Sequence, residues 1–121
     1  MLIYKNLNKL KRFSRSVIAI GNFDGLHLGH QKVLREASRK AKQNKLNLGV
    51  ITFEPVPVMF FNKKLKNHRI NSVNQKIEEL KKLNVNFLII IKFNKKFSNV
   101  SYKDFISNII FKKLLARFIF I

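Results

Sequence analysis

Short apolar runs rich in β-branched residues alternate along this chain with longer segments whose apolar residues have helical spacing. Continuous apolar runs of this kind are typical of strands that are covered on both faces. Strands that alternate with helices predict an α/β fold in which a parallel sheet carries helices on its faces. In such folds we expect a ligand to bind beyond the carboxyl ends of the strands.

The expected elements follow from these patterns and from helix-capping residues. Buried strands are predicted at 16–22, 47–53, 86–92 and 116–121, with a short edge strand at 2–4. Helices are predicted at 28–44, from Asn71 or Ser72 to about Leu83, and from Ser101 to about Leu115, where Asp104 completes the N-terminal cap. Residues 5–15 are predicted as a loop, and 54–69, with both prolines, as an irregular connection.

Length and composition exclude several classes of protein. The chain has 121 residues, typical of one domain, and no cysteine, which excludes disulfide scaffolds, thiolate zinc sites and cysteine nucleophiles. Its longest uncharged apolar run, Phe87–Ile91, is far shorter than the roughly 20 residues of a membrane-spanning helix. Residues 16–20 are too few for the apolar region of a signal peptide. We therefore expect a soluble, cytoplasmic protein without a membrane partner.

The chain is strongly basic, with 25 Lys and Arg against 6 Asp and Glu and a net charge of +19. Lysine supplies 19 of these cations and is spread along the whole sequence, while Asn and Ile are also abundant at 14 each. Such a bias is typical of a whole proteome rather than of one binding patch. We expect only nonspecific, salt-sensitive binding to nucleic acid, and a dedicated nucleic-acid binder stays as an alternative.

Scarce residue types are concentrated in the ten positions 21–30, GNFDGLHLGH. Three of the four glycines, two of the three histidines and one of the two aspartates fall there. The segment joins a predicted strand to the start of a predicted helix, where free N–H groups and the helix dipole favour phosphate. Gly21 and Gly25 allow a ligand to approach the backbone. Asp24 can hold the loop or assist a metal, and Gly29 frees space at the helix start.

The two histidines of this segment, His27 and His30, are three residues apart, so they point to one side of the first helical turn. Two imidazoles at this place suit the charge that develops during phosphoryl transfer. Two alternatives stay open: a glycine-rich turn with purely structural histidines, and a zinc site of His27, His30 and Asp24 that lacks an evident fourth ligand. The dinucleotide-binding fingerprint and the Walker A loop are missing from the sequence.

Residues 27–30, HLGH, resemble the signature of the HxGH nucleotidylyltransferases. The wider pattern resembles the N-terminal FMN adenylyltransferase module of bacterial FAD synthetase, which is usually joined to a riboflavin kinase. The motifs are, in order, 20–31 (IGNFDGLHLGHQ), 52–57 (TFEPVP), Phe60 and Phe61, 69–72 (RINS), 76–80 (KIEEL), Phe93, Phe97 and 101–105. The resemblance implies a Rossmann-like sheet of nucleotidylyltransferase type in a single partial domain over 1–121, without the kinase domain.

The resemblance also implies a reaction, in which FMN and ATP with Mg²⁺ give FAD and pyrophosphate during FAD biosynthesis from riboflavin. The FMN phosphate attacks the α-phosphorus of ATP directly. His27 and His30 are carried over as the catalytic residues, and no protein ligand to a metal is assigned. ATP-binding positions are Gly21, Asn22, Phe23, Asp24, Gly25 and Gly29, and the flavin side is formed by Pro55, Pro57 and Phe61.

The sequence departs from the family pattern in ways that bear on activity. Val56 stands where the family has histidine, and Asn71 where threonine is common. The chain ends before the family's Gly-x-Asp/Asn-Phe-x-Phe-Gly stretch and its second phosphate signature. It ends within the apolar segment 118–121, so we expect a truncated domain that self-associates through this strand. The alternative function is an inactive remnant with residual nucleotide binding, whereas 52–57 and 69–80 disfavour another HxGH transferase.

Overall fold

The computed structural model describes residues 1–5, 15–23, 28–54 and 73–121, apart from the side chain of Lys113. The strands in these ranges are β1 (Leu2–Tyr4), β2 (Val17–Ile20), β3 (Leu48–Glu54), β4 (Phe87–Lys92) and β5 (Phe118–Phe120). The helices are α1 (Leu28–Gln43), α3 (Val73–Lys82), α4 (Lys95–Ser98), α5 (Tyr102–Asp104) and the π-helix η4 (Phe105–Lys113). Within the described residues, no helix combines the length and the apolar character needed to span a membrane.

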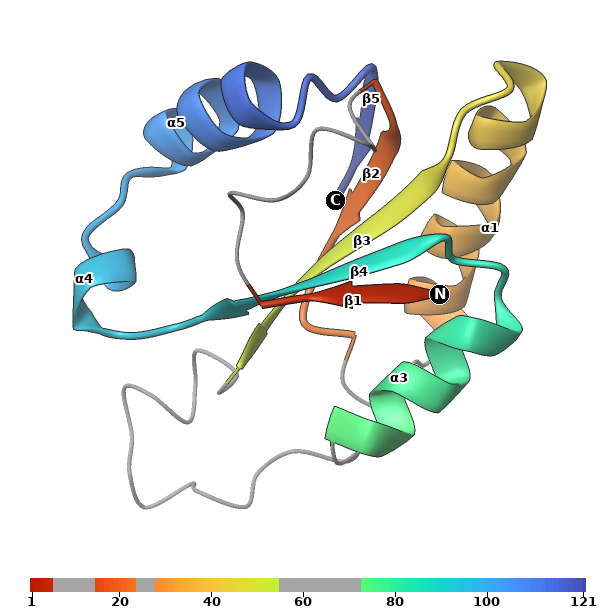
Figure 1. The fold of residues 1–121 in the computed structure, drawn as a ribbon, viewed down its shortest axis with the longest axis horizontal. Coiled ribbons are helices and arrows are strands. Elements are labelled where there is room, and N and C mark those ends of the chain that lie inside the picture. The colour runs from red at the N-terminus through yellow and green to blue at the C-terminus, as the bar shows by residue number, and fades with distance from the viewer. Residues whose placement is uncertain (6–14, 24–27, 55–72) are drawn as a thin grey trace.

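The five strands form one parallel sheet in the order β1-β4-β3-β2-β5 (Figure 1). Strand β3 lies in the middle, where Val17–Ile20 of β2 pair with Leu48–Ile51 on one side and β4 pairs on the other. The predicted parallel α/β fold is therefore confirmed. Because every pair is parallel, the carboxyl ends of the strands share one edge of the sheet, the edge at which ligands bind in such folds.

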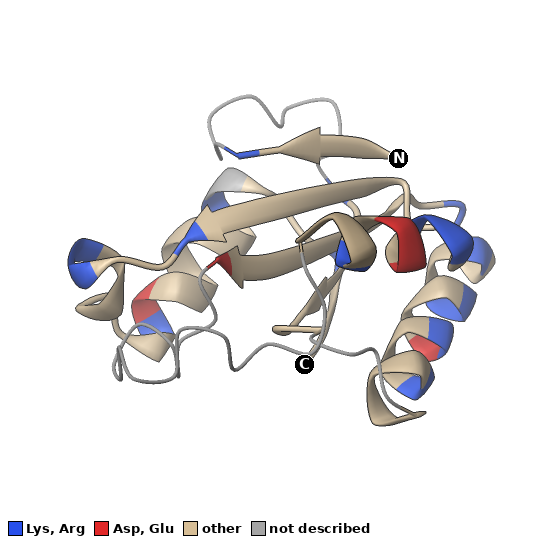
Figure 2. Cartoon of the chain, turned by 90° about the horizontal axis from the view of Figure 1, so that it is seen from below, with Lys and Arg blue, Asp and Glu red and all other residues tan. Residues whose placement is uncertain are grey.

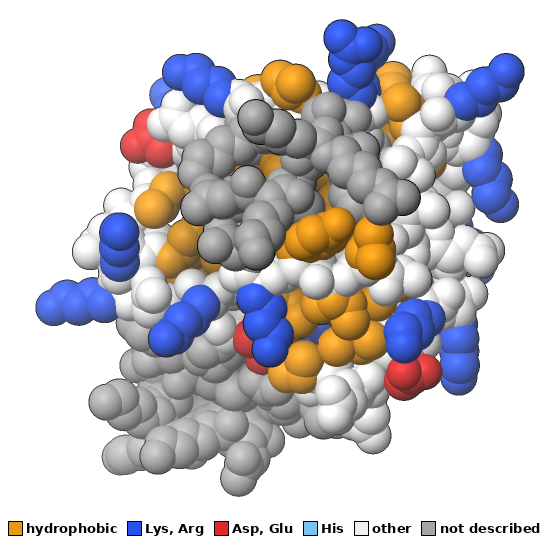
Figure 3. Space-filling view, viewed as in Figure 1, with side chains coloured by type: hydrophobic (Ala, Val, Ile, Leu, Met, Phe, Trp, Pro, Cys, Tyr) orange, Lys and Arg blue, Asp and Glu red, His pale blue; other side chains and the backbone are white. Residues whose placement is uncertain are grey.

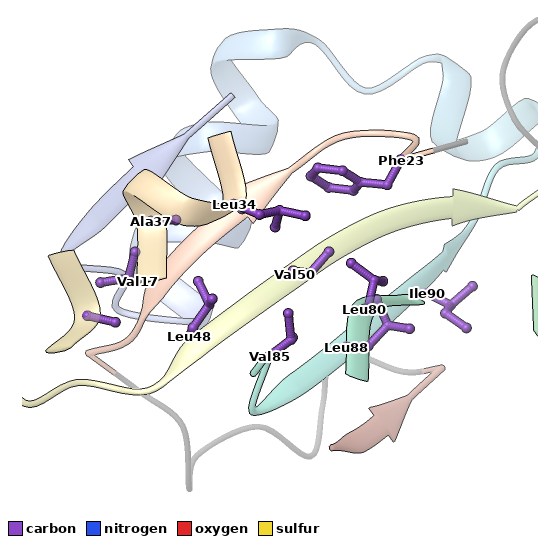
Figure 4. Packing of buried hydrophobic residues seen from close by; sticks show 12 residues of the cluster. Val17, Phe23, Leu34, Ala37, Leu48, Val50, Leu80, Val85, Leu88 and Ile90 are labelled. Carbon is purple, nitrogen blue, oxygen red and sulfur yellow. The ribbon is translucent and has the colours of Figure 1, made fainter. Parts of the chain in front are cut away.

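Each face of the sheet is covered by its own hydrophobic cluster. One cluster joins α1 and α3 to the sheet through Leu34, Ala37 and Leu80, which pack with strand residues such as Val50 and Leu88 (Figure 4). The second cluster joins η4 to the opposite face (Figure 1). Side chains alternate between the two faces along each strand, and this is why β2, β3 and β4 are apolar at almost every position.

The C-terminal helical region differs from the sequence prediction. The predicted cap is confirmed, because the Ser101 hydroxyl accepts a hydrogen bond from the Asp104 N–H at 3.1 Å. The helix that follows is α-helical only over Tyr102–Asp104 and continues as a π-helix over Phe105–Lys113. Its i→i+5 winding advances less per residue around the axis than an α-helix. Phe105 and Ile110, five positions apart, can therefore both be buried in the cluster on that face of the sheet.

One short helix was not predicted, and part of the prediction falls outside the described residues. The helix α4 is a single turn capped by Asn94, whose side chain accepts from the Phe97 N–H at 2.8 Å. Such a turn is too short to show an apolar period in the sequence. The proposed helix caps Asn71 and Ser72, most of the loop 5–15 and most of the connection 54–69 lie outside the described ranges.

The cations of the described residues are distributed over several elements rather than gathered on one surface. Figure 2 shows Lys and Arg on all the helices, with few acidic residues between them. On the face seen in Figure 3, exposed hydrophobic side chains lie near the middle, with Lys and Arg around them. Leu2 and Ile3 of the edge strand β1 are among the exposed hydrophobic residues of the chain.

A first prediction concerns Gly49, which pairs with Phe87 in the β3–β4 register. A Cβ at Gly49 would overlap the ring of Phe87, which is buried and cannot swing into solvent. We expect Gly49→Ala to lower the free energy of unfolding by about 2 to 3 kcal/mol, as overpacking does in a close-packed core. Urea denaturation monitored by circular dichroism measures this loss.

The control for this prediction is a double-mutant cycle. Because Leu is smaller than Phe, Gly49→Ala should cost much less in a Phe87→Leu background than in the wild type. An equal cost in both backgrounds would contradict the clash between the added methyl group and the ring.

Candidate functional site

The turn that follows β2 lies at the carboxyl edge of the sheet and leads toward the start of α1 (Figure 1). The Gly21 N–H donates to the Ile51 carbonyl at 3.1 Å, so the turn stays joined to β3 for one residue beyond the end of β2. Asn22 is exposed and Phe23 is buried, which means that the chain turns back toward the core between them. Phe23 has a φ of 49°, in the left-handed region that non-glycine residues seldom adopt.

The Phe23 side chain connects this turn to the first turn of α1. Phe23 is 1% exposed and belongs to the hydrophobic cluster that joins α1 and α3 to the sheet, and its ring is turned toward Leu34 (Figure 4). The ring also meets the imidazole of His30 in an edge-to-face contact, with centroids 5.3 Å apart at 64°. A Cβ at Gly21 would lie 3.1 Å from the same ring, so the absence of a side chain there makes room for it. Gly21, Phe23 and His30 thus form one packed unit.

The start of α1 offers an environment for an anion. The first N–H groups of a helix lack intrahelical partners and carry the positive end of the helix dipole. The first turn of α1 contains no acidic residue, and Gly29 is exposed there beside the half-buried His30. Since this helix start follows a strand at the carboxyl edge of a parallel sheet, the arrangement is suited to a phosphate group.

Behind the turn lies a polar network that the sequence analysis missed. The Thr52 hydroxyl donates to the Asn22 carbonyl at 2.9 Å, and Lys76 Nζ donates to Thr52 Oγ1 at 3.2 Å and to Glu54 Oε1 at 3.0 Å. The sequence did hold a signal for it. Lys76 lies three residues after Val73 and four before Leu80, on the apolar face of α3, where a solvated lysine is out of place.

The structure describes five of the predicted site residues and brings four of them to one place. Gly21, Asn22 and Phe23 form the turn, and His30 packs against Phe23. Gly29 precedes His30 in the first turn of α1. The other predicted site residues lie outside the described ranges: Asp24, Gly25, His27, Pro55, Pro57 and Phe61. The roles of all these residues stay predictions.

The zinc alternative cannot be built from the described residues. Among residues 1–5, 15–23, 28–54 and 73–121, no group of three His, Asp or Glu side chains is placed to hold a metal ion. Two of the three proposed zinc ligands, Asp24 and His27, lie outside these ranges, so that alternative keeps only His30 as a described member.

A parallel sheet with helices on both faces, and a glycine turn at the carboxyl edge of its strands, define a Rossmann-like α/β domain. Residues 9–121 match the family model of FAD synthetase. The chain therefore belongs to the FAD synthetase family.

The chain is also similar to a curated relative and to two solved structures. It is 38% identical over its whole length to the bifunctional riboflavin kinase/FMN adenylyltransferase of Buchnera aphidicola from Schizaphis graminum, of which it covers 39%. A structure titled as a macrolide-efflux protein from Streptococcus pneumoniae has a TM-score of 0.83 and 26% identity, over 98% of this chain and 40% of that one. Pantoate-beta-alanine ligase from Francisella tularensis shares the fold, with a TM-score of 0.53 and 22% identity over 82% of this chain and 38% of its own. The chain spans about two fifths of the length of its curated relative.

A second prediction tests the contact between Phe23 and His30. Phe23→Leu keeps a buried apolar side chain, so we expect a loss of about 1 kcal/mol in the free energy of unfolding. The His30 ring protons should change their chemical shifts in NMR spectra, because the aromatic ring at 5.3 Å is gone. Phe111→Leu, at an exposed position of η4, is the control and should leave both quantities unchanged. Unchanged His30 resonances in Phe23→Leu would contradict the contact.

Proposed function

We propose that this chain is an FMN adenylyltransferase module, which transfers AMP from ATP to FMN and releases pyrophosphate. Its membership of the FAD synthetase family supports this proposal, as does the printed name of its Buchnera relative. Since the chain spans 39% of that relative, the proposal concerns adenylyl transfer alone and not the riboflavin kinase activity in the relative's name.

The observation that carries the proposal is the packed unit of Gly21, Phe23 and His30 at the start of α1. The triphosphate of ATP lies across this helix start, where N–H groups and the dipole offset its charge. An oxygen of the FMN phosphate forms a bond to the α-phosphorus. The bond from that phosphorus to the bridging oxygen of the β-phosphate breaks, and pyrophosphate leaves with the electron pair.

The two histidines act on the charge that develops during this exchange. His30 is held by the ring of Phe23 at 5.3 Å, so its imidazole needs little reorganisation when the phosphate charge moves. His27 stands three residues earlier in the sequence and adds a second donor. Fixed donors of this kind lower the reaction barrier more than mobile ones, because they are already oriented when the protein folds.

Magnesium enters this reaction on the phosphates of ATP. Mg²⁺ keeps several of its waters and is commonly held by one or two carboxylates together with substrate phosphates. When bound, the ion offsets phosphate charge, and Asp24, the one carboxylate within 21–30, would hold the ion or its waters.

The flavin binds on the β3 side of the same edge. Strand β3 ends at Glu54, and the predicted flavin residues Pro55, Pro57 and Phe61 follow it directly in the sequence. β3 and β2 are neighbours in the sheet, so a ligand beyond β3 lies next to a phosphate at the start of α1. The two substrates therefore meet between the two strand ends.

The third prediction tests the activity itself. The purified chain with FMN, ATP and Mg²⁺ should form FAD, separated from FMN by chromatography. The variant His27→Ala/His30→Ala should form FAD at least about 100-fold more slowly, because two preorganised donors are lost. His68→Ala is the matched control, a histidine outside the segment 21–30, and should keep the wild-type rate. No FAD from chain shown to be folded would contradict the proposal and favour an inactive remnant.

The fourth prediction concerns self-association through β5, the partner arrangement that the sequence favours. In the described part of the chain β5 pairs with β2 on one side, its other side carries no strand, and Ile121 beside it is exposed. Light scattering at increasing concentration should show a rising average mass, since a free apolar edge pairs with another chain. Ile121→Lys should reduce this effect, whereas Phe111→Lys, on the exposed side of η4, should not. A constant monomer mass for the wild type would overturn this arrangement.

A further inference from the structure

Lys76 is the one cation in the described residues that lies in the interior. Its side chain is 2% exposed, although lysine is almost never fully buried unless it is paired. It comes from the face of α3 that packs on the sheet, next to Ile77 and Leu80 of the hydrophobic cluster. Its burial therefore depends on its polar partners, Thr52 and Glu54.

Two of these partners are neighbours on β3. Thr52 and Glu54 are two residues apart, so they point to the same face of the sheet, toward α3. Lys76 Nζ lies 3.0 Å from Glu54 Oε1 and 3.2 Å from Thr52 Oγ1. Thr52 is fully buried, and the side chain of Glu54 is 14% exposed. The lysine charge is thus balanced by a carboxylate that lies at the last position of the strand.

The network continues from Thr52 into the candidate site. A hydroxyl has one proton, and because Thr52 accepts from Lys76 it directs that proton to the Asn22 carbonyl at 2.9 Å. A charged donor strengthens the next hydrogen bond in such a chain. Asn22 stands between Gly21 and Phe23, the two residues that shape the turn. The buried ammonium group of Lys76 is therefore linked through Thr52 to the backbone of the turn.

Stability alone does not account for this arrangement. A buried ion pair loses the hydration of both charges, and its replacement by apolar side chains of similar volume is often neutral or stabilising. A methionine at position 76 could fill the same space on the apolar face of α3. What a methionine could not do is supply the charged donor that strengthens the hydrogen bond from Thr52 to the Asn22 carbonyl.

We propose that Lys76 is a positioning residue for the turn Gly21–Phe23, acting through Thr52 on the Asn22 carbonyl and so setting where the turn meets the phosphates of a nucleoside triphosphate. This inference rests on the proposed function for the ligand, but the link between Lys76 and the turn can be tested without any ligand. It also links Thr52 and Glu54 of the motif 52–57 to Lys76 of the motif 76–80, which lies apart in the sequence.

The fifth prediction uses the full chain and a matched pair of variants. Lys76→Met removes the buried ammonium group, and Lys81→Met removes an exposed one on the same helix, which pairs with Glu78 at 3.3 Å. In ¹H–¹⁵N NMR spectra, Lys76→Met should shift the amide signals of Gly21, Asn22 and Phe23, and Lys81→Met should not. ATP affinity, measured by titration calorimetry, should fall about 10- to 100-fold in Lys76→Met alone, the scale of loss when a site is slightly misplaced.

A second set of variants tests whether Thr52 carries the effect. Thr52→Val is nearly isosteric and removes the hydroxyl, whereas Thr52→Ser keeps it and should retain most of the ATP affinity. If Lys76 acts through Thr52, the double variant Lys76→Met/Thr52→Val should bind ATP no more weakly than the weaker of the two single variants. Losses that add would overturn the proposed route. If Lys76→Met does not fold, the amide shifts and the ATP affinity of Thr52→Val test the same route.

The outcomes separate this inference from the proposed function. If the wild type binds no ATP and forms no FAD, the proposed function fails, and the amide shifts of the turn still test the link to Lys76. If folded Lys76→Met shows the same turn amides and the same ATP affinity as Lys81→Met, the inference is overturned, even where FAD is formed.

Discussion

The pairing of β2 with β3 at the centre of the sheet is the contact on which the other features depend. Both strands are buried on both faces, and their register sets Ile20 beside Ile51. The hydrogen bond from Gly21 to Ile51 extends this pairing past the end of β2, and Thr52 is the next residue of β3. The turn and the polar network behind it are therefore neighbours because the two strands are.

Side-chain packing then connects this pair of strands to the start of α1. Phe23 is inserted into the same hydrophobic cluster as Leu34, and its ring also touches His30. The side chain that packs against the imidazole is therefore itself part of the core. Groups that are fixed during folding need no further ordering when a ligand binds.

Much of the fold could be predicted because its causes are local. The apolar runs at 16–22 and 86–92 contain β2 and β4, the run at 47–53 contains all of β3 except its last residue, Glu54, and the period of 28–44 contains α1. The π-helix η4 was not predicted, because its winding is set by the need to bury Phe105 and Ile110 on one sheet face. The single turn α4 was missed because four residues hold no period.

The sequence by itself determined the family, the parallel sheet and the place of the glycine turn before α1, because strand and helix periods and the rare residues of 21–30 are all short-range signals. Only the tertiary structure decided that the ring of Phe23 packs against His30. It also decided that Lys76 donates to Thr52, which in turn donates to the Asn22 carbonyl. These residues are up to 54 positions apart along the chain. Their meeting depends on strand order and helix packing, which no local pattern encodes.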